Sequence, residues 1–219
     1  MGDTERHSKT GKGILNKLTS ADSKDLRYEV KGVDGSVIWN ELNLYDYLSE
    51  YADIEGNIIY VCDLSVDDKS FEILTYIEGK EQKRFVVLKF DYVEKKFVSN
   101  EKYDISDNDD ENSPMIDDIV TPMLRNDKIL YAPVDQEICE ISRSDKKINR
   151  VPGLKDTVLK ASEEYGQYES VWWFRPLSYS DGYMLYFVTL LTDKANTDTA
   201  VMALVVFSDD GEMMDIMMK

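Results

Sequence analysis

Short apolar runs alternate with polar turns along most of the chain from residue 26 onwards. Runs rich in Val, Ile, Phe and Tyr and bounded by turn residues are typical of β-strands. The pattern predicts strands at 26–30, 36–44, 57–66, 70–78, 84–93, 96–105, 128–135, 137–142, 147–153, 170–179, 182–191, 199–208 and 212–219. We therefore expect a mainly β protein built from antiparallel hairpins.

Two segments depart from the strand pattern. In 44–52, the apolar residues Leu44, Tyr47, Leu48 and Tyr51 fit one helical face, which indicates a short helix or turn. In 154–168, apolar residues at near-helical spacing predict a helix.

One order of elements recurs along the chain. A turn residue is followed by an apolar run that holds a tyrosine (Tyr60, Tyr131 and Tyr186), and a hairpin follows each run. The hairpins span 86–99, 137–151 and 203–216, and in each the second strand is the more polar one. The segment "EICEISRSDKKINRV" is thus the middle copy of a repeat.

This order resembles the blades of β-propellers, in which an inner strand precedes an outer hairpin. The similarity is to exported bacterial six-bladed propeller proteins, whose blades read D-x-x-Y and then L-x-x-D-x-x-x-G, and it covers about residues 56–219. It implies propeller-like hairpin repeats. At about 40–50 residues per blade the chain holds four blades at most, as a four-bladed ring or part of a larger one. A β-sandwich or barrel is the alternative.

The net charge and the polar start of the chain limit the partners and the cellular locations that we expect. The net charge of −17 opposes binding to nucleic-acid phosphates. No apolar run approaches the roughly 20 residues of a transmembrane helix. Residues 1–24 are polar, so we expect a flexible leader there and a single mostly-β domain over 25–219. The leader is similar in composition to those of bacterial lipoproteins. This implies the cell envelope or exterior if a signal was removed, with the cytoplasm as the alternative.

The sequence contains few of the residues and motifs that enzymes use for catalysis. The only histidine, His7, lies in the polar leader, and no phosphate-binding glycine motif occurs. Cys62 and Cys139 lack metal or redox spacing and fit small buried residues of strands, although a disulfide between them stays open. We expect no enzymatic activity, and a carboxylate-based hydrolase is the least favoured reading.

The aromatic run "YESVWWFRPLSY" is the main candidate for a binding surface. Strand alternation places Trp172 and Phe174 on one side and Trp173 and Arg175 on the other. A Trp beside an Arg is a pairing enriched at binding hot spots and able to stack on sugar rings. Burial of both sides between sheets is the alternative. The predicted ligand-binding residues are Tyr168, Trp172, Trp173, Arg175 and Tyr179.

An acidic segment, "DNDDENSPMIDD", is a weak metal candidate. Its carboxylates Asp107, Asp109, Glu111 and Asp118 match ligand positions of a calcium-binding loop. Position six is Asn112 where such loops have glycine, and the closing residue is an aspartate. A solvated surface insertion is the favoured interpretation, and we expect no cofactor, with calcium as the alternative.

The C-terminal strand carries four methionines. Alternation predicts that Met214, Ile216 and Met218 pack inwards and that Met213, Asp215 and Met217 face outwards. An unpaired last strand is an edge through which a homo-oligomer could form. The sequence thus predicts a binding module for a protein or a glycan. The alternative is an assembly subunit whose aromatic and methionine-rich edges are buried against partners.

Overall fold

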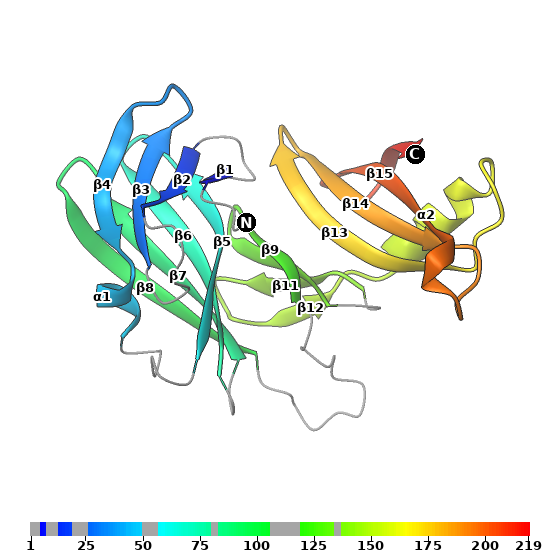
Figure 1. The fold of residues 1–219 in the computed structure, drawn as a ribbon, viewed down its shortest axis with the longest axis horizontal. Coiled ribbons are helices and arrows are strands. Elements are labelled where there is room, and N and C mark those ends of the chain that lie inside the picture. Colours follow the sequence, from blue (N-terminus) through cyan, green and yellow to red (C-terminus); the bar gives the residue numbers. More distant parts are fainter. Residues whose placement is uncertain are drawn as a thin grey trace. The chain divides into compact units, whose positions relative to one another are not determined.

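The computed structural model describes residues 5–7, 13–18, 26–49, 57–79, 83–105, 119–133 and 137–219. These residues form four antiparallel sheets of four strands each, here called A to D in chain order (Figure 1). The chain divides into two compact units, 1–106 with sheets A and B, and 107–219 with sheets C and D. The mainly β prediction is confirmed.

The described part of the first unit holds eight strands and one short helix. Sheet A has the order β1-β2-β3-β4 and sheet B the order β5-β6-β7-β8. Helix α1 (Tyr45–Leu48) follows β4, where the sequence indicates a short helix or turn. The strands are β1 (Glu5–His7), β2 (Gly13–Lys17), β3 (Arg27–Gly32), β4 (Val37–Asn43), β5 (Ile58–Val66), β6 (Ser70–Glu78), β7 (Lys83–Asp91) and β8 (Lys96–Ile105).

The second unit repeats this plan. Sheet C has the order β12-β11-β10-β9 and sheet D the order β13-β14-β15-β16. Helix α2 (Leu154–Ser162), which the sequence predicts, packs against β13 and β16. The strands are β9 (Ile119–Arg125), β10 (Lys128–Pro133), β11 (Cys139–Ser142), β12 (Ile148–Arg150), β13 (Ser170–Ser180), β14 (Tyr183–Leu191), β15 (Ala200–Ser208) and β16 (Met213–Met218).

The repeat is confirmed, and one of its copies has to be realigned. Tyr131 and Tyr186 both lie in the second strand of their sheets, and the predicted hairpins are the third and fourth strands. Tyr60, however, lies in the first strand of sheet B and is 44% exposed. The second strand of sheet B is β6, and its tyrosine, Tyr76, is buried. Each sheet is therefore a four-stranded meander, the plan of a propeller blade.

The turns between third and fourth strands share one backbone feature. A residue with left-handed φ precedes the fourth strand in every sheet: Gly35, Lys95, Lys146 and Gly211. The loops of sheets A and D close in the same way. The N–H of Gly32 donates to the carbonyl oxygen of Ser36, and the N–H of Ser208 donates to the carbonyl oxygen of Glu212. These are three-residue hairpin loops with glycine at the left-handed position.

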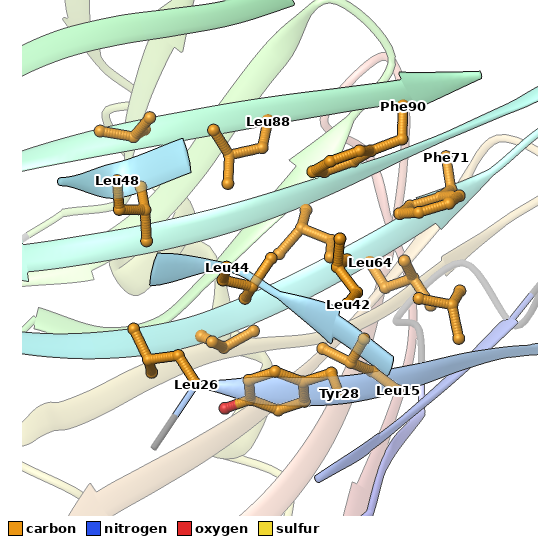
Figure 2. Close-up of a cluster of buried hydrophobic side chains, with 14 of the residues drawn as sticks. Leu15, Leu26, Tyr28, Leu42, Leu44, Leu48, Leu64, Phe71, Leu88 and Phe90 are labelled. Carbon is orange, nitrogen blue, oxygen red and sulfur yellow. The ribbon is translucent and has the colours of Figure 1, made fainter. Parts of the chain in front are cut away.

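An apolar core lies between sheets A and B of the first unit. Leu15, Tyr28 and Val30 from sheet A pack on Leu64, Phe71 and Phe90 from sheet B, as Figure 2 shows for all but Val30. Sheet A approaches β5 closely at Gly13, where a Cβ atom would lie 2.6 Å from Val66 Cγ2. Glycine at this position therefore allows the two sheets to meet.

The structure differs from the predicted domain plan at the start of the chain. Residues 13–17, assigned by their polarity to a flexible leader over 1–24, form β2 and pair with β3. Leu15 is 1% exposed there, so one apolar side chain is enough to join this short strand to the core. The predicted single domain over 25–219 is instead divided at residue 106.

Candidate functional site

The aromatic run forms β13, the first strand of sheet D, and a bulge changes the predicted alternation. Val171 pairs with Leu190 and Trp173 with Thr189, so Trp172 is the extra residue of the bulge. Phe174 is buried in the core of the second unit, whereas Trp172 is only half-buried. The prediction that Trp172 and Phe174 share a face is therefore wrong.

Trp172, Trp173 and Arg175 form one stack. The two indole rings lie nearly parallel with centroids 4.6 Å apart. The Arg175 guanidinium carbon lies 3.7 Å from the centroid of the Trp173 ring, within cation–π range. Two flat groups this close to one ring occupy its opposite faces, so both faces of Trp173 are covered. Partial burial lowers the pKa of Arg175, although an arginine in a protein remains charged.

Two hydrogen-bond donors in this stack lack acceptors. Trp173 Nε1 and Arg175 Nε are both buried, and neither has a partner among the described residues. A buried donor without an acceptor costs about 1–3 kcal/mol. Both atoms are closed to solvent, so the cost is borne within the stack itself.

The stack lies on a face of sheet D that does not belong to the core. Residues directly opposite in antiparallel strands share a face, and the register places Arg175, Phe187, Leu204 and Met217 in one row across the sheet. None of them belongs to the core cluster, which contains their neighbours from the opposite face. The second face of sheet D comprises Trp173, Arg175, Leu185, Phe187, Thr189, Met202, Leu204, Val206, Asp215 and Met217.

This second face is apolar and partly exposed. Met202 is 47% exposed and Met217 is 63% exposed, while Leu185, Phe187, Leu204 and Val206 are half-buried. Contiguous apolar surface of this kind marks interaction sites on proteins.

Sheet A provides a contrast. The face opposite its core residue Leu15 carries Asn16, Glu29 and Lys31. Lys31 Nζ lies 2.6 Å from Glu29 Oε1, and this pairing lowers the pKa of the Glu29 carboxyl. A polar, ion-paired face is suited to water, and the second face of sheet D is not.

The predicted packing of the C-terminal strand is partly correct. Ile216 and Met218 contact the core, and Asp215 and Met217 are exposed, as predicted. Met213 and Met214 are exchanged, because a register shift between Val206 and Phe207 turns Met213 inwards and leaves Met214 exposed.

The five predicted binding residues do not form one group. Tyr168 and Tyr179 pack against the core cluster of the second unit, apart from the face that carries Trp173 and Arg175. The Tyr179 hydroxyl donates to Asp209 Oδ2 at 3.0 Å. Only Trp172, Trp173 and Arg175 of the predicted set contact one another.

Around Tyr179 lies a charged cluster that the sequence analysis missed. Arg125 pairs with Asp209, and its guanidinium lies 5.0 Å from the Tyr179 ring centroid. Glu140 Oε1 is 3.9 Å from Arg125, and Glu140 Oε2 is 2.7 Å from Lys128 Nζ. The pKa of the neighbouring Tyr186 is raised to about 12, mainly by burial, so its hydroxyl stays protonated at physiological pH. The cluster ties sheet C to sheet D.

We expect Arg125→Met to lower the free energy of unfolding by about 1–3 kcal/mol, since it removes a largely buried cation from the half-buried Glu140 and the exposed Asp209. Urea denaturation of Arg125→Met, Asp209→Asn and the double variant measures the coupling. The double variant should lose less than the sum of the single losses. Simple additivity would show that the ion pair contributes nothing.

The calcium candidates Asp107, Asp109, Glu111 and Asp118 lie outside the described residues. Within the part of the chain that the structure describes, no group of three or more His, Cys, Asp or Glu side chains is arranged to hold a metal ion. Cys62 and Cys139 are free thiols, and burial raises the pKa of Cys139.

No described helix is both long and apolar enough to cross a bilayer.

Four four-stranded meanders in succession define a propeller-type repeat module. No protein-family model and no curated protein matches the chain. Among solved structures, BamB from Moraxella catarrhalis is similar at 8% identity over 96% of this chain and 62% of its own, with a TM-score of 0.32.

The β-propeller domain of Nup133 from Vanderwaltozyma polyspora is similar at 12% identity over 100% of this chain and 53% of its own, with a TM-score of 0.35. The computationally designed protein Ika8 is 7% identical over 94% of this chain and 68% of its own, with a TM-score of 0.30. The chain thus spans less than two thirds of BamB and of the Nup133 domain. Superpositions at this level say nothing about ligands or partners.

Proposed function

We propose that the chain is a non-enzymatic protein-recognition module that binds its partner through the second face of sheet D. The observation that carries this proposal is the apolar character of that face around the Trp173–Arg175 pair. Aromatic and arginine side chains dominate the binding energy of protein interfaces. Exposed methionines beside them supply adaptable apolar contact.

A protein partner fits this face better than a glycan does. Sugar recognition by stacking needs an accessible ring face, and Trp173 has Trp172 on one side and Arg175 on the other. A polypeptide supplies carboxylates for the half-buried Arg175 guanidinium, together with apolar side chains for the row from Phe187 to Met217. Both requirements are met by one ligand class.

The contacts of the best-placed carboxylates support the non-enzymatic part of the proposal. Asp209 and Glu140, two carboxylates whose charges act on the buried Tyr186, are paired with Arg125 and Lys128. A glycosidase needs one carboxyl group as an acid and the other as a base or nucleophile. Asp209 pairs across two sheets and Glu140 pairs within sheet C.

Selection from a random peptide library displayed on phage, beside a glycan panel, tests the proposal. We expect peptides that combine apolar residues with a carboxylate to be enriched, and no glycan to shift the melting temperature. Met217→Lys should weaken peptide binding at least tenfold, because it places a charge in the apolar row. Val98→Lys, at an exposed position of β8, is the matched control.

Binding of the selected peptides must depend on the second face of sheet D. Equal binding to wild type and to Met217→Lys would refute the proposed surface. A glycan that stabilises the protein and changes tryptophan fluorescence would replace the protein partner with a sugar.

A further inference from the structure

We infer that two copies of the chain associate face to face through the second face of sheet D, with Arg175 of each copy reaching Asp215 of the other in the neighbouring row. The inference rests on the proposed function, since it names the partner of that face. It differs from pairing at the edge of the C-terminal strand, because side chains of the sheet face make the contact.

The shape and composition of the face fit a sheet as partner. Its rows run across four strands, and its central positions are Leu185, Phe187, Leu204 and Val206. Two sheets with apolar faces pack about 10 Å apart with strands nearly aligned. A second copy offers a face of matching width and twist.

Charge decides the orientation of the two copies. Arg175 lies on β13, at one edge of the sheet, and Asp215 lies on β16, at the other edge. A two-fold axis parallel to the strands places β13 of one copy over β16 of the other. An axis perpendicular to the strands would place β13 over β13 and β16 over β16, so Arg175 and Asp215 would stay at opposite edges without their opposite charges meeting.

With the axis parallel to the strands, the opposite charges come within reach. Arg175 shares a row with Met217, and Asp215 belongs to the next row. Neighbouring rows are about 7 Å apart, a distance that an arginine side chain spans. Asp215 is exposed, and its Oδ1 accepts the N–H of Ile216, so its other oxygen is left for the guanidinium of the half-buried Arg175.

The overall charge opposes this association and so provides a signature. Each copy carries −17, and repulsion between such charges is screened by salt. Contact between apolar faces is not weakened by salt. The dimer should therefore become tighter between low and moderate ionic strength.

Sedimentation velocity over ~1 µM to ~1 mM protein, at low and moderate salt, tests the inference on the full chain. We expect a concentration-dependent dimer. Arg175→Asp and Asp215→Arg should each weaken it at least tenfold, since each places like charges opposite one another. An equimolar mixture of the two variants should restore dimerisation, because each contact then pairs opposite charges. Val98→Lys should leave the dimer unchanged.

Any other result of the sedimentation experiment overturns the proposed dimer. A monomer at every concentration overturns the dimer, and peptide binding that Met217→Lys abolishes would then leave the proposed function standing. A dimer that neither charge reversal weakens uses another surface, which also overturns the inference. Loss of both the dimer and face-dependent peptide binding would remove the proposed function as well.

Discussion

Replacing Phe90 with alanine should lower the free energy of unfolding by about 3–5 kcal/mol, the cost of emptying a fully buried phenylalanine site. Phe90 is 0% exposed and lies in the middle of an aromatic group. Its ring centroid is 5.0 Å from those of Phe71 and Tyr47, and 5.7 Å from that of Trp39. The residues around it come from sheet A, sheet B and α1, so the gap cannot close by moving one side chain.

Urea denaturation followed by circular dichroism measures this loss, and hydrogen exchange identifies the segments affected. Because the chain divides into two compact units, we expect Phe90→Ala to weaken protection mainly in residues 26–105. Tyr165→Ala, at an exposed position of the second unit, is the control and should change stability by less than about 0.5 kcal/mol. Equal losses in the two variants would contradict the described core.

The long strands could be predicted because their local sequence agrees with their environment. Sheets B and D contain strands of nine or more residues with continuous apolar runs, such as β6 and β14. Their turns hold Asp, Gly and Lys, the residues that hairpin loops need. The meander plan follows from these two features, and so does the alignment of Tyr131 with Tyr186.

The sequence pattern assigns the first copy of the repeat to Tyr60, because two successive strands carry the same pattern. Both β5 and β6 contain a tyrosine in an apolar run, and the two rings stack with centroids 5.9 Å apart. Sequence pattern alone does not decide which of Tyr60 and Tyr76 is the inner one. Burial decides it, and burial is a property of the assembled sheet.

Strand β9 was missed because Pro122 interrupts its pattern. Proline lacks the N–H that a ladder needs, so it argues against a strand in the middle of a sheet. In the structure β9 is the edge strand of sheet C, and its pairing with β10 shifts beside Pro122. Proline is tolerated in such a place, which only the topology reveals.

The three residues of the stack could be singled out from the sequence, but their geometry could be predicted only in part. Trp172, Trp173 and Arg175 are adjacent in sequence, and their contact is local. The bulge at Trp172 brings the two indoles together, where simple alternation separates them. The Arg125–Asp209 pair joins residues 84 positions apart, so it lay beyond local reasoning. The row from Arg175 to Met217 depends likewise on strand register.

Strand β2 is the element at which the sequence-based prediction and the structure differ most clearly. Polarity assigns 1–24 to a flexible leader, whereas the structure buries Leu15 at 1% exposure against Tyr28 and other residues of the first core (Figure 2). We expect Leu15→Ala to lower the free energy of unfolding by about 2–5 kcal/mol, the range for buried leucines.

The chain offers a matched control three residues away. Leu18 is 43% exposed and contributes its backbone N–H to Arg27, a bond that alanine retains. Leu18→Ala should therefore cost less than about 0.5 kcal/mol, although it removes the same atoms as Leu15→Ala. Urea denaturation of the two variants side by side gives the comparison. If both variants were as stable as the wild type, residues 13–17 would be the leader that their polarity suggests. A large loss at Leu15 alone would establish β2 as part of the first core, because only burial distinguishes the two leucines.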